Sequence, residues 1–273
     1  LEGNGKAHIA SILSSENIAY NLPTEFIGKK VIHLDTVGST NDYAKEIGNK
    51  VSGGTLIISE QQTKGKGRLG RVWKSKSGDG IWMSLIIKPK IEPYKAPFLT
   101  LVAGASVVKA LSNLGVEASI KWPNDIIVHN KKICGILTEL SAEMERVNYV
   151  VIGIGINIKT IDFPDEIKEK ATSLYKEGYK LSRVDIVRQF CIEFEKLYKG
   201  YILDGNKQDT LELCRKYSAI IGKQVYVIKN NKRELVKCID INENGNLIVK
   251  EKNGEIQEIM SGEVSIRGVK GYV

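Results

Sequence analysis

The first stretch whose residue types could do chemistry is residues 62–73, which read Q-T-K-G-K-G-R-L-G-R-V-W. Its glycines, at positions 65, 67 and 70, have the G-x-G-x-x-G spacing of a dinucleotide-binding turn. Its cations alternate with those glycines and are Lys64, Lys66, Arg68 and Arg71. Phosphate and carboxylate groups are therefore the first ligands to consider, because glycines let a backbone approach closely and cations neutralise anionic oxygens.

A dinucleotide-binding fold needs a helix that starts at the glycines and an acidic residue about 20 positions further on. Residues 71–80 show no apolar period of 3.6 residues, and residues 62–73 contain no acid. The pattern therefore argues against a nicotinamide or flavin site. It leaves open a loop that wraps a flexible polyanion, a solvated basic hairpin loop, and a nucleic-acid patch on which Trp73 and Trp82 stack against bases.

Three further stretches place polar residues beside apolar strands. Residues 121–125 read K-W-P-N-D, residues 132–139 read K-I-C-G-I-L-T-E, and residues 153–157 read G-I-G-I-N. Taken singly, they are equally well explained as a turn, a buried strand and a close approach of two backbones.

Taken together, in this order and at these spacings, the four stretches closely resemble the biotin protein ligases, the enzymes that attach biotin to carboxylases. The resemblance runs from about Gly28 to the end of the chain. It includes Ser39-Thr40-Asn41 and the stretch S-G-E-V-S-I-R at residues 261–267.

The resemblance implies an ATP-dependent, Mg²⁺-requiring reaction in two steps. Biotin and ATP would give biotinyl-5′-adenylate and pyrophosphate. The biotinyl group would then pass to one lysine of a biotin carboxyl carrier protein or domain, in acetyl-CoA carboxylase or another biotin-dependent carboxylase.

The residue types suit this chemistry. A carboxylate is ionised at neutral pH, so its attack on phosphorus needs no general base, and the barrier lies in bringing two anions together. The resemblance implies Lys132, Arg68 and Asp125 as catalytic residues. Lys132 would stabilise the pentavalent phosphate and the leaving AMP, while Asp125 would hold Mg²⁺ and later steer the acceptor amine.

The other site residues are also carried over from the family pattern. The biotin pocket is expected to contain Ser39, Thr40, Asn41, Gln62, Gly65, Lys66, Gly67, Arg68, Lys132, Gly135, Leu137 and Gly153. The ATP and adenylate site is expected to contain Lys66, Arg68, Arg71, Trp73, Lys121, Asn124, Asn157 and Arg267. Ser39 is expected to cap a helix as well, and residues 64–76 to form a lid that keeps water from the adenylate.

Lys66 departs from the family pattern, which usually has arginine there. Lysine lacks the bidentate fork of a guanidinium, so retention of the adenylate would be looser.

Two other functions remain to be separated from biotin ligation. A lipoate-protein ligase shares acyl-adenylate chemistry on a similar architecture, but its typical glycine-rich stretch is not found here and a C-terminal barrel fits biotin ligases better. A nucleic-acid-binding module would explain the net charge of +8. It would not explain the K-W-P-N-D stretch, so no nucleic acid is expected as a partner of this chain.

Bulk composition limits the protein class. Four cysteines without a C-x-x-C pair, and only three histidines, argue against a zinc cluster or a disulfide framework and favour the cytoplasm. No apolar run is expected to reach the roughly 20 residues that cross a bilayer, so no membrane partner is expected. Residues 1–30 are too short for a winged helix, so no DNA-reading domain is expected in this chain. A homodimer is left open.

The elements that would position these residues predict an α+β fold. Strands expected at 31–34, 55–59, 81–87, 118–121, 125–129, 133–141 and 148–157 would form a mixed, largely antiparallel sheet, because closely spaced strands pair as hairpins. Helices at 40–47 and 97–114 are expected on one side, together with a helical region over residues 164–217. Five short strands after residue 220 predict a small barrel, and the resemblance implies that it is SH3-like. The domains are therefore placed at 1–30 (N-terminal helix and linker), 31–219 (catalytic) and 220–273 (barrel).

Overall fold

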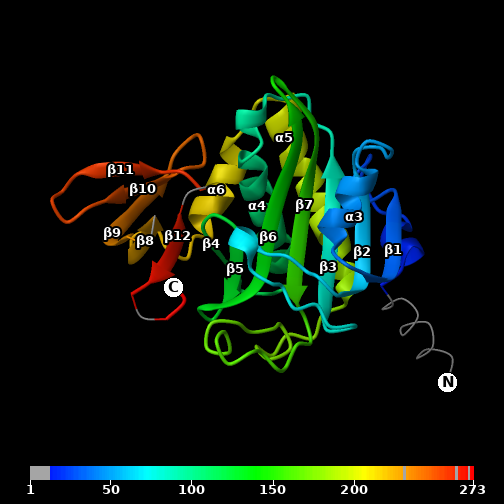
Figure 1. Ribbon diagram of the computed structural model, residues 1–273, viewed down its shortest axis with the longest axis horizontal. Helices are drawn as coiled ribbons and strands as arrows, with labels where there is room; N and C mark the ends of the chain where they lie inside the picture. Colours follow the sequence, from blue (N-terminus) through cyan, green and yellow to red (C-terminus); the bar gives the residue numbers. More distant parts are fainter. Residues whose placement is uncertain (1–12, 230–231, 262–263, 270) are drawn as a thin grey trace.

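Two sheets and the helices around them form the protein, which is described here from a computed structural model (Figure 1). The described residues are 13–229, 232–261, 264–269 and 271–273. Strands of the large sheet lie in the order β1-β2-β3-β7-β6-β5-β4. Their bounds are β1 Val31–Val37, β2 Thr55–Gln62, β3 Gly80–Ile87, β4 Ser119–Lys121, β5 Asp125–Val128, β6 Lys131–Glu143 and β7 Arg146–Asn157.

The large sheet is mixed, as expected, with β1 and β2 parallel and the other neighbouring strands antiparallel. One face is covered by α4 (Phe98–Asn113) and α5 (Arg183–Leu203), which lie behind the strands in Figure 1. Helix α6 (Gln208–Lys216) packs against α4 on the side of the small sheet. Alternate residues of β3, such as Met83 and Leu85, join the main apolar core on the face that α4 and α5 cover. The other face is left for the site.

Helix α3 (Thr40–Ile47) corrects the expectation that the helices share one side of the sheet. It lies in front of the sheet, where Ala44 packs with Ile57, Ile86 and Tyr149 in a separate apolar cluster. The reason is topological, because α3 is the crossover between the parallel strands β1 and β2. This crossover brings the N-terminus of α3 to the end of β1.

The sequence was expected to contain no apolar run of the length that crosses a bilayer, and helix α4 shows that this expectation was wrong. The segment Pro93–Asn113 is long and apolar enough to cross a membrane by length and composition. However, 72 % of its most apolar window is buried inside the protein, between the large sheet and α5. Burial of this kind is what the central helix of a globular core shows.

Residues 164–182 were expected to be helical and are not. This segment consists of local turns and irregular backbone. Between its turns, Thr172 N–H donates to the Lys132 carbonyl at 2.9 Å and Leu174 N–H to the Asn157 carbonyl at 3.1 Å. Because these amides bond outside the segment, they interrupt a continuous helical ladder.

The small sheet follows α6 and has the order β11-β10-β9-β8-β12, antiparallel throughout. Its bounds are β8 Gln224–Lys229, β9 Lys232–Ile241, β10 Leu247–Lys250, β11 Ile256–Ile259 and β12 Ser265–Gly268. The five expected strands are confirmed, but the sheet is not closed into a barrel, because its edge strands β11 and β12 do not pair among the described residues.

Before β1, the short helix α2 (Ser15–Ala19) and its connection pack against α5. Residues 1–12 of the expected N-terminal helix and linker lie outside the described residues. Glu195 on α5 anchors the connection, since its carboxylate accepts hydrogen bonds from the backbone N–H groups of Glu25, Phe26 and Ile27 at 2.6–2.9 Å. Burial alone would raise the pKa of Glu195, but these donors outweigh it and lower the pKa.

We expect Glu195→Ala to lower the free energy of unfolding by about 3 kcal/mol, because three N–H groups lose an ionised acceptor. Urea unfolding followed by circular dichroism measures this change. Glu193→Ala is the matched control on the same helix, since Glu193 accepts only an exposed bond from Asn113 and its loss should cost at most about 0.5 kcal/mol. Equal unfolding free energies for the two variants would contradict the anchoring role.

Candidate active site

A row of register partners crosses the large sheet on the face opposite α4. Trp82 on β3 pairs with Gly155 on β7, Gly155 with Gly135 on β6, Gly135 with Asp125 on β5, and Asp125 with Lys121 on β4. Side chains of directly paired residues point to the same face. The row therefore has two charged side chains at one end and two positions without side chains in the middle.

The glycines provide space that other side chains fill. A Cβ atom on Gly155 would lie 2.6 Å from the Trp73 indole, and one on Gly135 would lie 3.0 Å from both Trp73 and the Lys132 amine. A Cβ atom on Gly153 would lie 2.2 Å from Asn41 Oδ1. Trp73 and Asn41 thus rest directly on the backbone of the sheet.

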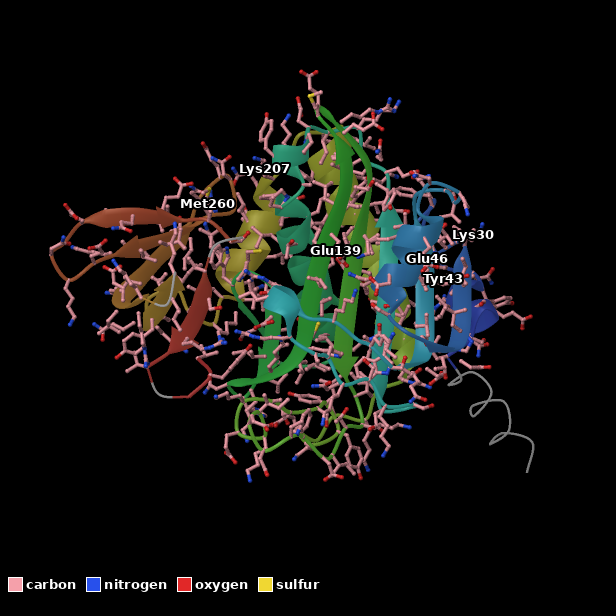
Figure 2. The ribbon with its side chains drawn as sticks, in the orientation of Figure 1. Lys30, Tyr43, Glu46, Glu139, Lys207 and Met260 are labelled. Carbon is pink, nitrogen blue, oxygen red and sulfur yellow. The ribbon has the colours of Figure 1, made fainter. Side chains whose placement is uncertain are left out.

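The glycines leave a trough along this row on the surface of the sheet, and residues at the start of α3 form its polar end. Gln62 at the end of β2 accepts hydrogen bonds through Oε1 from the Thr40 backbone N–H (2.9 Å) and hydroxyl (3.1 Å). The Ser84 hydroxyl lies 2.6 Å from Asn41 Oδ1, and the Asn41 amide donates to Glu139 on β6 at 2.8 Å. Glu139 and α3 lie on the same side of the sheet (Figure 2).

Ser39 occupies the N-cap position of α3, as expected, but its side chain makes no capping hydrogen bond. Gln62 satisfies a free N–H of the first turn in its place. The Ser39 hydroxyl therefore remains available to line the pocket.

The loop of glycines and cations is a distorted hairpin. Trp73 N–H donates to the Gly65 carbonyl at 2.9 Å and Gly67 N–H to the Arg71 carbonyl at 2.7 Å. A Cβ on Gly65 would lie 2.4 Å from the Trp73 carbonyl, so this close approach requires glycine. The turn itself is a single 3₁₀ turn, Arg68–Gly70, and no α-helix follows it, in agreement with the argument against a dinucleotide site.

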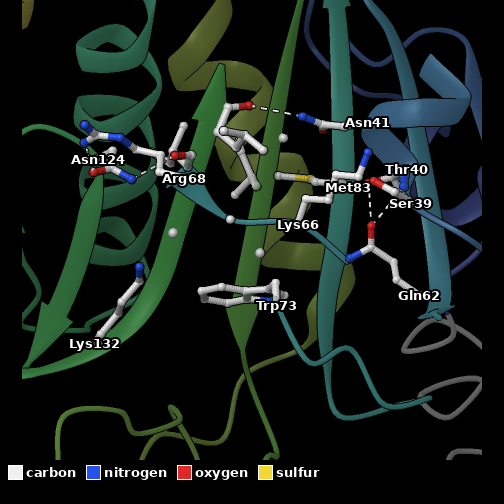
Figure 3. Close-up of a pocket in the computed structure, with 17 residues that line it drawn as sticks. Ser39, Thr40, Asn41, Gln62, Lys66, Arg68, Trp73, Met83, Asn124 and Lys132 are labelled. Atoms are coloured by element: carbon white, nitrogen blue, oxygen red, sulfur yellow. Dashed lines mark hydrogen bonds between the residues drawn. The ribbon is translucent and has the colours of Figure 1, made fainter. Parts of the chain in front are cut away.

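Two cavities meet under this loop, and Figure 3 shows the inner one. The inner one is narrow and has the polar end described above. The outer one is larger, about 690 Å³, and is lined by seven Lys or Arg side chains and three carboxylates. The residues that line both cavities are Gly67, Arg68, Trp73, Asn124 and Lys132.

Arg68 and Lys132 are held at this junction. Arg68 donates to Asn124 Oδ1 at 2.8 Å and to the Ser261 carbonyl at 2.6 Å. The Lys132 ammonium lies 2.5 Å from Asp125 Oδ1. Burial alone would raise the pKa of Asp125, but the Lys132 ammonium and the Tyr272 hydroxyl outweigh burial and lower it, so Asp125 is ionised at neutral pH.

Lys121 has an unusual environment at the end of the row. Its side chain is 2 % exposed, and its ammonium has no hydrogen-bond acceptor among the described residues. Burial lowers the pKa of Lys121 to about 7, and the Asp125 carboxylate offsets only part of that effect. The ammonium lies 3.3 Å from the ring centroid of Tyr272.

The structure brings the sequence-predicted residues into two groups. All the residues expected around biotin line the inner cavity except Gly65, which supports the hairpin. The outer cavity is lined by seven of the residues that the sequence predicted for the ATP site: Arg68, Arg71, Trp73, Lys121, Asn124, Asn157 and Arg267. Lys66 lines only the inner cavity, and its ammonium pairs with Asp42 at 2.7 Å.

Sequence reasoning missed Ser84, Gly155 and Tyr272. Ser84 is signalled by a hydroxyl in the otherwise apolar strand β3, and Gly155 by its spacing of two from Gly153, which places both on one face. Nothing in the sequence around Tyr272 signals that its ring meets Lys121, because the two residues are 151 positions apart.

Comparisons with known proteins agree with this geometry. The profile described as "Biotin/lipoate A/B protein ligase family" matches residues 34–157, and "Biotin protein ligase C terminal domain" matches residues 220–267. The bifunctional ligase/repressor BirA of Bacillus spizizenii is 40 % identical, over 93 % of this chain and 79 % of its own. The biotin--[acetyl-CoA-carboxylase] ligase of Mycobacterium tuberculosis is 34 % identical, over 53 % of this chain and 56 % of its own.

Among solved structures, the biotin protein ligase from Aquifex aeolicus in complex with biotin and ATP has a TM-score of 0.76 to this chain at 31 % identity. The match covers 88 % of this chain and 99 % of that one. The same fold therefore extends over both sheets.

We expect Gly153→Ala to weaken binding of biotin, the ligand implied by the sequence resemblance, by about tenfold, because the new methyl group displaces Asn41. Isothermal titration calorimetry measures the affinity. Gly104→Ala on α4 is the control, since its new Cβ would meet nothing closer than Ile136 at 3.9 Å. Unchanged affinity in Gly153→Ala would remove Asn41 and Gly153 from the biotin pocket.

Proposed function

The chain belongs to the biotin protein ligase family, and we propose that its two cavities carry out the ATP-dependent activation of biotin and its transfer to a carrier lysine. The observation that supports this proposal is that the inner and outer cavities meet. A narrow polar pocket and a cation-rich cavity share Arg68, Trp73 and Lys132, so that two anionic ligands would meet at these cations.

The inner cavity suits biotin. The ureido group both donates and accepts hydrogen bonds, and Asn41, Gln62 and Ser39 offer such partners at the polar end. Leu137 and Trp73 provide apolar walls for the ring and its chain. With its ring at the polar end, biotin directs its carboxylate toward Lys132.

The outer cavity suits ATP. In the first step a biotin carboxylate oxygen attacks the α-phosphorus, a new O–P bond forms, and pyrophosphate leaves. Lys132 and Arg68 neutralise the carboxylate and the α-phosphate as they approach, and Arg71, Lys121 and Arg267 face the remaining phosphates. The Trp73 indole N–H has no partner among the described residues and lies over Gly155.

Asp125 fits the expected Mg²⁺ site, with the nucleotide supplying the other ligands. Mg²⁺ commonly binds one or two carboxylates together with substrate phosphates, and it would neutralise phosphate charge here. No cluster of three metal-binding side chains occurs among residues 13–229, 232–261, 264–269 and 271–273. Asp125 is ionised and lines the outer cavity, so it is the residue we propose to hold the ion.

In the second step the amine of a carrier lysine attacks the acyl carbon, an amide forms, and AMP leaves with its phosphate neutralised by Lys132. Asp125 would orient the incoming amine. The partner we propose is a biotin carboxyl carrier domain, as the names of the acetyl-CoA-carboxylase ligases indicate for those relatives. The four cysteines are buried and unpaired, which suits the reducing cytoplasm proposed for this reaction.

The decisive experiment is release of pyrophosphate on mixing the protein with biotin and ATP, followed by mass-spectrometric detection of biotin on one lysine of a carrier domain. Lipoate in place of biotin tests the lipoate ligase alternative, and titration with duplex DNA tests the nucleic-acid alternative. Release with lipoate alone, or DNA binding without release, would overturn the proposal.

We expect Lys132→Ala and Arg68→Ala each to lower the rate of pyrophosphate release by about 100-fold, because each removes a cation aimed at the reacting charge. Lys131→Ala is the matched control for Lys132, since neighbouring residues of a strand point to opposite faces. Lys66→Arg should retain activity. A rate within twofold of wild type in either alanine variant would exclude that residue from the site.

We expect trypsin to cut within residues 64–76 of the free protein, because Lys64, Arg71, Lys74 and Lys76 are exposed there. Biotin with ATP should slow this cleavage, since the loop would close over the adenylate and exclude water. Mass spectrometry of the fragments measures the rate, with cleavage after the exposed Lys252, which lines neither cavity, as the internal reference. Equal cleavage with and without ligands would contradict the lid.

A further inference from the structure

Tyr272 makes two contacts that no known role of the site requires. Its ring lies 3.3 Å from the Lys121 ammonium, and its hydroxyl donates a hydrogen bond to Asp125 Oδ2. Burial, reinforced by the Asp125 carboxylate, raises the pKa of Tyr272, so the phenol keeps its proton and remains a donor. The Tyr272 side chain thus contacts both the Lys121 ammonium and the Asp125 carboxylate of the outer cavity.

These contacts give partners to the buried Lys121 ammonium and to Asp125 Oδ2. An ammonium that is 2 % exposed and has no acceptor among the described residues is costly, and the face of an aromatic ring recovers part of that cost. Lys132 already takes Asp125 Oδ1, and Tyr272 takes the other oxygen. The cation and the carboxylate are both occupied without a nucleotide.

The segment that carries Tyr272 folds back on β12. Gly268 N–H donates to the Tyr272 carbonyl at 3.4 Å, and a Cβ on Gly268 would lie 2.4 Å from the carbonyl carbon of Val273. Tyr272 lines the outer cavity together with Arg71 and Arg267, but it does not line the inner cavity. Its ring therefore lies in the proposed nucleotide site and outside the proposed biotin pocket.

Resting on the function proposed above, we propose that Tyr272 is an internal substitute for the nucleotide, which the phosphates of ATP displace from Lys121 and Asp125 when they bind. A phosphate oxygen forms a charge-assisted hydrogen bond with an ammonium, and this is stronger than a contact with a ring face. The Tyr272 ring and a phosphate of ATP would approach the Lys121 ammonium from the same side, so it cannot contact both at once. Tyr272 consequently competes with ATP and leaves biotin binding unaffected.

The test is the KM for ATP in pyrophosphate release at saturating biotin, in wild type, Tyr272→Ala and Tyr272→Phe. We expect Tyr272→Ala to lower the KM for ATP by about three- to tenfold, because the competing ring and hydroxyl are gone. Tyr272→Phe keeps the ring and should lower it by less. Tyr94→Ala is the control, since Tyr94 also contacts a lysine ammonium, at 5.6 Å, but lines neither cavity.

A KM for ATP that rises or stays unchanged in Tyr272→Ala would overturn the proposal, because the ring would then be part of the nucleotide site or irrelevant to it. The biotin affinity measured without ATP should equal that of wild type in both variants, and a loss of it would also count against the proposal.

A second measurement uses the wild-type protein and does not depend on how the variants fold. Hydrogen–deuterium exchange of the Gly268 amide should become faster when a non-hydrolysable ATP analogue binds, because its bond to the Tyr272 carbonyl is lost. Slower or unchanged exchange would overturn the proposal. Absence of pyrophosphate release by wild type would instead overturn the proposed function, so the two failures are distinguishable.

Discussion

The pairing register of β3, β7, β6, β5 and β4 is the constraint on which the site depends. It aligns Gly155 and Gly135 with Asp125 and Lys121 in one row on the exposed face. A shift by one residue would turn each of these positions to the helical face, where the apolar core lies. The apolar residues between them, such as Ile154 and Ile136, therefore fix the site by being buried on the other side.

The small sheet contributes to this site as well as following it in the chain. Trp122 Nε1 donates to the Gly245 carbonyl at 2.9 Å, and Arg68 donates to the Ser261 carbonyl. Tyr272 and Arg267 complete the outer cavity. The edge strand β12 has one partner strand among the described residues, and its residues line the outer cavity together with the cations of the large sheet.

Local patterns predicted most of the strands and the residues of the trough, since alternating apolar residues, glycines and the K-W-P-N-D stretch are encoded over short distances. What was missed is long-range. The side of the sheet occupied by α3 follows from the parallel pairing of β1 with β2, which no local pattern reveals. Residues 164–182 lack a continuous helix because Thr172 and Leu174 bond to the ends of β6 and β7. Tyr272 meets Lys121 only in the folded chain.

The balance of charge in the outer cavity links stability to function. Seven Lys or Arg side chains and three carboxylates line that cavity. One of the carboxylates, Asp125, pairs with Lys132, accepts a hydrogen bond from Tyr272 and interacts electrostatically with Lys121. Repulsion among such cations opposes folding, whereas an anionic ligand relieves it, so binding free energy comes partly from strain already present in the free protein. The aromatic ring on Lys121 limits that strain without adding a negative charge, which would hold the lysine too strongly for a phosphate to replace. A carboxylate in place of Tyr272 would also repel Asp125, to which the phenol donates a hydrogen bond, and this is the physical reason that a phenol suits the position.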